Sequence, residues 1–543
     1  MLGRVAQSPL SWPRVAIIGA GISGIAVGVN FFRAGLANFE IFESEDGVGG
    51  TWRVNTYPGA SVDVPSAIYQ FGFKTHPWKR THATQAELLE YLENIAREYE
   101  LFPHCRFNTR VVEARWSDID NQYDVITGDG GQYQYDFVIS AVGFLSVPKI
   151  PDWPGLPDFT GPVFHTAGWD HDVDLSGKRV AIVGVGSSST QVVPAIQSQV
   201  AHLYVFQREP GWVLPKGQRE FSADENRLRA SSWRRQFERA KMNLAMEWSY
   251  IDQPVHIAGS KRNVKAEAMA RSYIEEVFAE RADLRELVTP KYAFSGKRRI
   301  ISDDYYPALL HSNVELVARP VMDITKKGLI DVDGTEYPVD VIIIATGFKA
   351  ASYLSELRVT GRGGVDLHQA WADEPYALVG MSVPGFPNFY MLYGPGTNGT
   401  GALGFFWLAE QEVAQIVREI RRASRRRYVA IDTRPRAARA YDRWMQRRLH
   451  RTAWNFANNY MKSPSGRIVT QFSGSATLHW LLLRFVRPLG TFGWRSASAA
   501  PPPAVDKMPP RQSLMGSRGH GVLGKHHSRF QALIHHRSRP SDC

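Results

Sequence analysis

The chain has 543 residues, of which 44% are apolar, an ordinary globular composition that is long enough for several domains with large cores. Its formal charge of +11 does not indicate a nucleic-acid partner, because the nine Lys or Arg and two Asp between Arg487 and Cys543 supply +7 of it. Cys105 and Cys543 are the only cysteines, which excludes a disulfide framework and the paired cysteines of dithiol redox enzymes.

Membrane and export signals are not found. No run of the sequence approaches the roughly 20 consecutive apolar residues that span a bilayer, so we expect no transmembrane segment. The first strand-like run begins at Arg14, which leaves no room for a signal peptide and predicts a cytoplasmic protein. Residues 487–543 are rich in Pro, Ser, Gly, His and Arg, a composition that predicts disorder. No metal site is predicted.

The first element is the apolar run Val15 to Ile18, which predicts a buried parallel strand. Gly19, Gly21 and Gly24 follow it as G-x-G-x-x-G. These glycines permit a tight turn, the approach of a pyrophosphate and close packing of the next helix, whose positive end faces the phosphates. Glu43 ends a second apolar run nineteen residues past Gly24 and can accept hydrogen bonds from ribose hydroxyls. The pattern predicts a dinucleotide site.

The next segment, Gly47 to Tyr69, is dense in Gly and Pro yet carries Trp52, Tyr57 and Tyr69. Loops of this kind usually wrap a ligand, and a flat flavin ring needs apolar and aromatic walls with a few polar contacts. Asp63 suits either a place at such a ring or ordinary capping of a turn, and the loop alone leaves both open. After it, Thr84 to Leu101 predicts an amphipathic helix with a structural role.

A second strand-glycine-helix unit begins with the apolar run Val180 to Val183. Two such units in one chain are far more specific than one. Glycines for a tight turn and hydroxyl or amide groups at a helix N-terminus suit the phosphates of a second dinucleotide. The candidate residues are Gly184, Gly186, Ser187, Ser188 and Gln191.

The strand that follows ends at Arg208, twenty-two residues past Gly186. An acidic residue at this point favours NADH, whereas an Arg accommodates a 2′-phosphate, so NADPH is predicted. Glu209 comes next, and its carboxylate either repels that phosphate or turns outward.

Residues 217–292 are charged and poor in glycine, and their mixed apolar spacing predicts a helical insertion that caps the active site. Trp212, Trp233, Trp248 and Tyr250 either line a substrate channel or belong to the core, and aromatics at helical spacing are more often core.

Between the two glycine loops lies Phe159 to Asp170, with the spacing F-x-G-x-x-x-H-x-x-x-W-D. Alone, this segment predicts a packed interdomain loop. Together with the pattern G-G-x-W-x-x-N-x-Y-P-G-x-x-x-D that ends at Asp63, it resembles the fingerprint of Baeyer-Villiger monooxygenases. The resemblance extends over roughly Val15 to Arg484. It implies that His165 and Trp169 serve a linker that lets two domains swing.

The resemblance also implies FAD in the first nucleotide site and NADPH in the second. It places Trp52 and Asp63 near the isoalloxazine and Lys297 at the NADPH phosphate. It gives Arg298, with Asp63 beside it, the catalytic role, and Arg299 is a competitor for that role. The remaining FAD contacts expected are Ser23, Thr51, Tyr69 and Val111.

In the implied reaction, NADPH reduces FAD, the reduced flavin traps O2 as a C4a-peroxyflavin, and this species attacks a ketone to give an ester or lactone. The peroxide must stay deprotonated, and a fixed guanidinium stabilises the anion without giving up a proton. Alternatives are a flavin-containing monooxygenase that oxygenates the nitrogen of an amine or the sulfur of a sulfide, an oxidase that releases peroxide, and a non-catalytic dinucleotide-binding redox sensor.

The expected fold is α/β, with two Rossmann-like dinucleotide-binding domains, the FAD domain being split around an NADP domain that carries the helical insertion. The chain is expected to return to the FAD domain through the strand in VDVIIIATGF, residues 339–348. The expected bounds are 1–150 and 339–486 for the two parts of the FAD domain, 151–216 and 293–338 for the two parts of the NADP domain, 217–292 for the insertion and 487–543 for the disordered tail.

Overall fold

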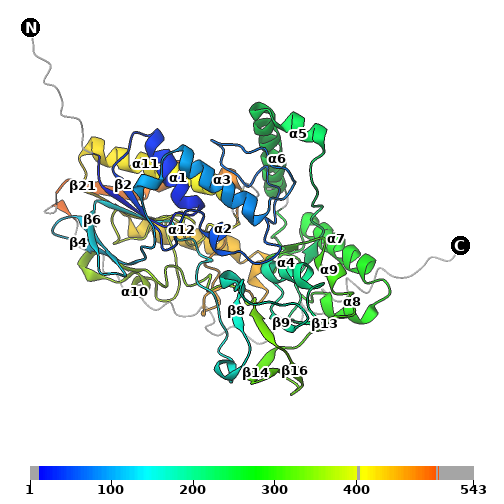
Figure 1. The fold of residues 1–543 in the computed structure, drawn as a ribbon. Coiled ribbons are helices and arrows are strands. Elements are labelled where there is room, and N and C mark those ends of the chain that lie inside the picture. Colours follow the sequence, from blue (N-terminus) through cyan, green and yellow to red (C-terminus); the bar gives the residue numbers. More distant parts are fainter. Residues whose placement is uncertain (1–11, 253, 400–403, 497–498, 501–543) are drawn as a thin grey trace, which may run out of the picture. The chain divides into compact units, whose positions relative to one another are not determined.

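The computed structural model describes residues 12–252, 254–399, 404–496 and 499–500 (Figure 1). These residues contain two five-stranded sheets, each made of parallel strands. We call the part of the chain around the first sheet the first lobe and the part around the second sheet the second lobe. Within the described ranges, no helix is both long and apolar enough to cross a bilayer.

The first sheet contains the two strands predicted around the first glycine loop, and each pair of neighbours in it is parallel. Its central strand is fully buried, as expected for a sheet covered on both faces. In spatial order the strands are β19 (Phe389–Met391), β7 (Phe137–Ser140), β1 (Val15–Ile18), β2 (Phe39–Phe42) and β3 (Cys105–Arg106).

Three helices pack together over this sheet. Helix α1 (Ile22–Arg33) begins at the glycine loop and contacts both α11 (Gly404–Arg426) and α3 (Gln85–Glu98). The Thr84 side chain accepts a hydrogen bond from Glu87 N, and the Glu87 side chain accepts one from Thr84 N, so α3 starts with a capping box. The helix predicted between Thr84 and Leu101 is therefore confirmed.

The second sheet forms around the second glycine loop and is also parallel throughout. Its central strands β9 and β17 carry Val and Ile side chains that are almost entirely inaccessible to solvent. In spatial order the strands are β13 (Val314–Val317), β10 (His202–Phe206), β9 (Arg179–Val183), β17 (Val341–Ile344) and β8 (Val163–His165).

The strand β17 corrects the predicted return point. It pairs with β9 on one side and β8 on the other, so it belongs to the second sheet and not to the first. An apolar run followed by Ala-Thr-Gly fits a central strand of either sheet, which is why the sequence alone misassigned it. The chain returns to the first lobe after Ile344.

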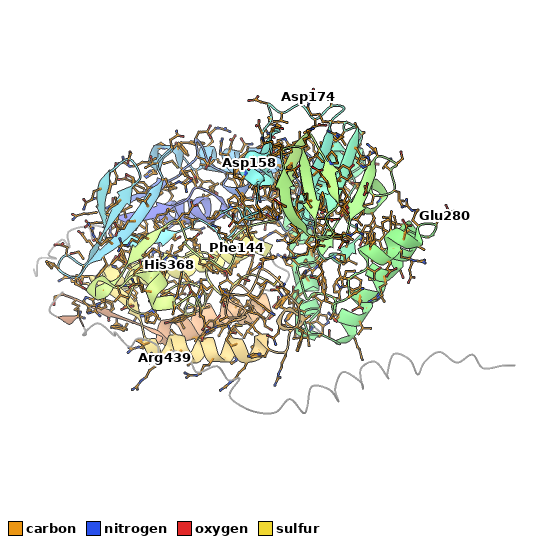
Figure 2. The ribbon with its side chains drawn as sticks, turned by 90° about the horizontal axis from the view of Figure 1, so that it is seen from below. Phe144, Asp158, Asp174, Glu280, His368 and Arg439 are labelled. Atoms are coloured by element: carbon orange, nitrogen blue, oxygen red, sulfur yellow. The ribbon has the colours of Figure 1, made fainter. Side chains whose placement is uncertain are left out.

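The chain crosses between the lobes at two neighbouring segments. Lys149 N donates to Gly347 O at 2.8 Å, and Lys349 N donates to Val147 O at 2.9 Å. The segment that enters the second lobe and the segment that leaves it are thus hydrogen-bonded to each other. Figure 2 shows Asp174 and Glu280 on the second lobe and His368 and Arg439 on the first.

Smaller sheets and short helices complete the two lobes. The smaller sheets are β4 (Val111–Ser117), β5 (Gln122–Thr127) and β6 (Gln132–Tyr135) with β18 (Arg358–Thr360), then β14 (Val321–Thr325), β15 (Gly328–Asp331) and β16 (Glu336–Pro338), then β11 (Val213–Leu214) with β12 (Ile300–Ile301), and β20 (Ala430–Thr433) with β21 (Thr491–Trp494). Other helices are α2 (Thr51–Val54), α4 (Ser187–Ile196), α9 (Tyr305–Ala308), α10 (Leu367–Trp371), α12 (Pro435–Leu449), α13 (Ala476–Leu481) and α14 (Arg487–Leu489).

The predicted insertion is helical. It contains α5 (Ala223–Arg229), α6 (Ser232–Asp252), α7 (Lys261–Val277) and α8 (Ala282–Val288). Of the aromatic candidates, Trp212, which precedes the insertion, lies in the core of the second lobe, whereas Trp233 and Trp248 on α6 are largely exposed. The core alternative is therefore wrong for these two rings.

The predicted disordered tail begins too early. Arg487 is 0% exposed, and its guanidinium donates to both carboxylate oxygens of Glu419, at 2.8 and 3.1 Å, and to Ser382 Oγ at 2.8 Å. Tyr390 OH donates to the same carboxylate at 2.9 Å. This network ties the chain after α13 to α11 and β19, so the fold continues through β21. The rest of the predicted tail, 497–498 and 501–543, lies outside the described residues.

Candidate active site

The first glycine loop has the geometry that the sequence predicted. Gly19 has φ +103°, and a Cβ on Gly24 would lie 1.9 Å from Gly19 O, so both positions require glycine. Glu43 Oε2 accepts from Ala20 N at 2.6 Å, and Oε1 accepts from Glu45 N at 3.0 Å. The buried Glu43 carboxylate thus lies against the loop, with lone pairs left for a ribose.

The remaining candidates for FAD contacts are spread around this loop. Thr51 is exposed at the start of α2, and Ser23 is buried in the first turn of α1. Trp52 lies edge-on to Tyr69, with ring centroids 5.8 Å apart, and burial raises the pKa of Tyr69 to about 12. Val111 starts β4 and packs into the core. The Trp52 and Tyr69 rings thus pack against each other, and their place at a flavin stays a prediction.

The second glycine loop leaves room at one position. Gly184 has φ +118°, and a Cβ there would lie 2.4 Å from Ala345 O, so this glycine makes the turn. At Gly186, the residue before α4, a Cβ would meet no described atom within 4 Å. An open approach at the positive end of a helix fits a dinucleotide phosphate.

Asp63 and Arg298 come together although 235 residues separate them. Arg298 Nη2 donates to Asp63 Oδ2 at 2.9 Å. Ser187 Oγ donates to Asp63 Oδ2 at 3.3 Å, and Gln191 Nε2 approaches Asp63 Oδ1 at 3.4 Å. The carboxylate of the first lobe is therefore held by the start of α4 and by the Arg of the second lobe.

The Arg298 guanidinium stays protonated. Burial alone would lower the pKa of its guanidinium, but the Asp63 carboxylate offsets burial, and the pKa lies above its ordinary value. Half of the Arg298 side chain remains exposed, whereas 14% of the Asp63 side chain does. Arg298 thus presents a permanent cation, and its charge lowers the pKa of the Tyr69 phenol in opposition to the larger effect of burial.

Arg299 faces elsewhere. His256 is buried, and burial, then Arg448 and Arg299, lower its pKa to about 4. His256 stacks on Trp454 with ring centroids 4.8 Å apart, at a contact between the insertion and the C-terminal part of the first lobe. The neighbouring Arg298, and not Arg299, pairs with Asp63.

The residues expected to bind the 2′-phosphate of NADPH lie close to the carboxylate of Glu209. Arg208 is exposed just past the end of β10. Lys297 forms an ion pair with Glu209, and its ammonium lies 5.1 Å from the Tyr292 ring centroid. Glu209 therefore does not turn away, and it holds the Lys that the resemblance places at the phosphate.

The fingerprint His has both ring nitrogens engaged. Ala167 N donates to His165 Nδ1 at 3.0 Å, and Nε2 lies 3.1 Å from Gly347 O, to which it donates. Burial lowers the pKa of His165, which agrees with a neutral ring. Trp169 packs edge-on against Phe164, with ring centroids 5.1 Å apart. His165 thus binds the same carbonyl as Lys149 at the crossing between the lobes.

Two further groups near the site were missed. Tyr393 OH donates to Asn398 Oδ1 at 2.6 Å, and Tyr393 N donates to Glu412 Oε2 at 3.0 Å. Burial raises the pKa of Glu412 to about 8. The signal was present, because Glu412 interrupts the apolar stripe of α11 formed by Ala409, Val413 and Ile416. A carboxyl on such a stripe marks a buried polar contact.

Known proteins resemble the chain over most of its length. Residues 13–224 match a family described as flavin-binding monooxygenase-like. The chain is 35% identical over 471 residues to a Baeyer-Villiger monooxygenase of Pseudomonas aeruginosa, covering 85% of this chain and 88% of that one. It is 37% identical over 470 residues to a Baeyer-Villiger monooxygenase of Streptomyces coelicolor, covering 85% and 89%.

Solved structures show the same relationship. An oxidised steroid monooxygenase bound to NADP is 29% identical, with a TM-score of 0.79, and covers 89% of this chain and 99% of its own. A closed cyclohexanone monooxygenase is 28% identical, with a TM-score of 0.79 and the same coverage of 89% and 99%. The chain belongs to the Baeyer-Villiger monooxygenase family.

Proposed function

We propose that this protein is an FAD- and NADPH-dependent monooxygenase that inserts one oxygen atom of O2 beside the carbonyl of a small-molecule ketone, giving an ester or lactone. The observation that carries the proposal is the Asp63–Arg298 ion pair, in which the first lobe supplies the carboxylate and the second lobe the guanidinium. Ser187 and Gln191 of α4, the helix after the second glycine loop, contact the Asp63 carboxylate of this pair. N- or S-oxygenation and a non-catalytic sensor are not favoured, because the curated relatives are Baeyer-Villiger monooxygenases.

Bound FAD would supply hydride acceptance and O2 activation, chemistry that no side chain of the chain can provide. The chain's own task is to hold negative charge and exclude water. Arg298 suits this task because its guanidinium keeps its proton at any working pH. Asp63 orients the guanidinium, and the hydroxyl of Ser187 and the amide of Gln191 in turn hold Asp63.

The direct test is product analysis. The purified holoenzyme is incubated with NADPH, ¹⁸O2 and a set of cyclic and linear ketones, with sulfides and amines as competitors. We expect a lactone or ester that contains one ¹⁸O atom per NADPH oxidised. Oxygenation of sulfides or amines with no ketone product would assign the chain to the N- or S-oxygenating class.

Gly186 gives a test of the second dinucleotide site. In Gly186→Ala, the methyl group meets no described atom, so we expect the free energy of unfolding to change by less than about 1 kcal/mol. NADPH affinity should fall about tenfold or more, because the methyl group occupies the approach of the pyrophosphate. Urea denaturation and titration calorimetry measure the two quantities. Gly168→Ala, which is equally open, is the control, and equal losses of affinity in both variants would contradict the assignment.

Glu209 gives a test of coenzyme preference. We expect Glu209→Gln to release Lys297 and to tighten binding of 2′,5′-ADP about fivefold, since the pair is partly exposed and worth roughly 1 kcal/mol. Binding of 5′-AMP, which lacks the 2′-phosphate, should not change. Titration calorimetry compares the two ligands. If both gain equally, Glu209 repels nucleotides in general and does not set the coenzyme preference.

We also place the enzyme in the cytoplasm, where NADPH is regenerated. This rests on the cysteine usage and on the coenzyme that Arg208 predicts.

A further inference from the structure

Helix α6 is amphipathic in the reverse sense. Five of its large apolar side chains point outward, with exposed fractions between 54% and 72%. The spacing of these residues puts them on one side of the helix over about 27 Å. They are Trp233, Phe237, Leu244, Trp248 and Ile251. We call them the outer face of α6; Figure 1 shows α6 beside α5 at the margin of the ribbon.

The inward side of α6 carries charged side chains that contact the rest of the protein. Arg235 donates to the carbonyls of Arg229 and Ala230, at 2.6 and 2.7 Å. Arg239 approaches Glu410 of α11 at 3.7 Å. The inner side therefore fixes the helix to the protein by polar contacts.

Glu247 anchors the other end of the helix. Its carboxylate accepts from Ala476 N at 3.0 Å and from Thr477 N at 2.7 Å, at the start of α13. A surface helix of a globular protein shows the opposite arrangement, with apolar residues inward. The outer face of α6 thus has no role in holding the described fold together, and contiguous exposed apolar surface marks an interaction site.

Among the described side chains of α6, the free charges around the outer face are positive. Arg234 and Lys241 are exposed on this side, and the Arg234 guanidinium lies 5.3 Å from the Trp233 ring centroid. Among the described side chains of α6, the carboxylates are engaged, since Glu238 pairs with Arg229 and Glu247 caps α13. A partner for this face must accept apolar side chains and carry negative charge.

A second copy of the chain fits these charges poorly. The outer face runs from Trp233 to Ile251, so its midpoint lies next to Lys241. A two-fold contact places the same surface on both partners. Such a contact would bring two Arg234 and two Lys241 side chains together, with the described carboxylates of α6 already engaged elsewhere, which opposes association.

We propose that the outer face of α6 binds the surface of an anionic lipid bilayer. Trp, Phe, Leu and Ile enter the boundary between headgroups and acyl chains, while Arg234 and Lys241 contact the phosphates. Interfacial helices combine an apolar face with Lys and Arg in this way, and Trp favours the interface. The helix lies on the bilayer and does not cross it.

Vesicle co-sedimentation of the full-length holoenzyme tests the proposal. The vesicles are phosphatidylcholine alone or phosphatidylcholine with about 30% phosphatidylglycerol. We expect binding to the anionic vesicles and weak binding to the neutral ones. Phe237→Ser with Leu244→Ser should lower the partition coefficient about tenfold or more, because two large side chains no longer leave water. Lys241→Glu should lower binding to the anionic vesicles alone.

Ile119→Ser is the matched control, because Ile119 is 84% exposed in the turn between β4 and β5, outside α6. FAD content and NADPH consumption should remain unchanged in all these variants. Equal sedimentation of the wild type and the α6 variants would overturn the proposal. A second result would also overturn it: the wild type does not bind vesicles but forms a dimer in sedimentation velocity, and Phe237→Ser with Leu244→Ser dissociates that dimer.

Discussion

Replacing Arg298 with alanine is expected to lower the rate of ester formation about a thousandfold, the upper range for removing one fixed group that stabilises developing negative charge. The physical reason is that Arg298 is the fixed guanidinium of the proposed site, held at 2.9 Å from the Asp63 carboxylate. FAD content should stay near that of the wild type, because Arg298 makes no contact with the first glycine loop in the described structure. The measurements are ester formed and hydrogen peroxide released per NADPH oxidised.

Arg299→Ala is the matched control. It removes a cation one residue away whose charge acts on the buried His256. Ester formation should stay within a few-fold of the wild type in this variant. A conservative Arg298→Lys variant should recover little, because an ammonium cannot reproduce the planar fork that Asp63 orients. The catalytic assignment is wrong if Arg299→Ala abolishes ester formation and Arg298→Ala does not.

Loss of the buried Arg487 is expected to lower the free energy of unfolding by about 3–5 kcal/mol, the range for breaking a buried ion pair by removing one partner. In Arg487→Met, the Glu419 carboxylate keeps only the Tyr390 hydroxyl and the Gln415 amide of its present donors. An uncompensated charge at a site with 2% exposure is costly. Urea denaturation followed by circular dichroism measures the change.

The double variant Glu419→Leu with Arg487→Met should be more stable than Arg487→Met alone, because no buried charge is left. Arg484→Met, in an exposed position of the same segment, serves as the control and should change stability by less than about 0.5 kcal/mol. Equal destabilisation by Arg484→Met and Arg487→Met would show that the loss of stability does not come from breaking the Arg487–Glu419 ion pair.

The sequence predicted the parts of the fold that local patterns encode. Both glycine loops, the strands before them and the position of Glu43 follow from spacing within about thirty residues, and the structure has them. Three of the glycines were readable because only a residue without a Cβ tolerates the positive φ angles of Gly19 and Gly184 and the close contact at Gly24.

Contacts between distant segments could not be read in the same way. No local pattern says that β17 lies in the second sheet, that Glu209 pairs with Lys297, or that Arg487 is buried. Each depends on which surfaces meet in three dimensions. The pairing of Asp63 with Arg298 was expected from a family resemblance, and spacing alone left Asp63 equally suited to capping a turn.

The nested order of the strands also fixes the order in which the protein can fold during synthesis. The first sheet has four strands before Ser140, but its edge strand β19 begins at Phe389 and the helix α11 that packs on α1 begins still later. About 250 residues must be translated in between, which takes roughly 10–50 s at ribosomal rates. During that time the second lobe can emerge and fold as a contiguous unit. The face of α1 that packs against α11 stays exposed to solvent until α11 is made. The first lobe is therefore the first to be synthesised and the last to be completed. A chaperone would be needed while its apolar surface is exposed to solvent.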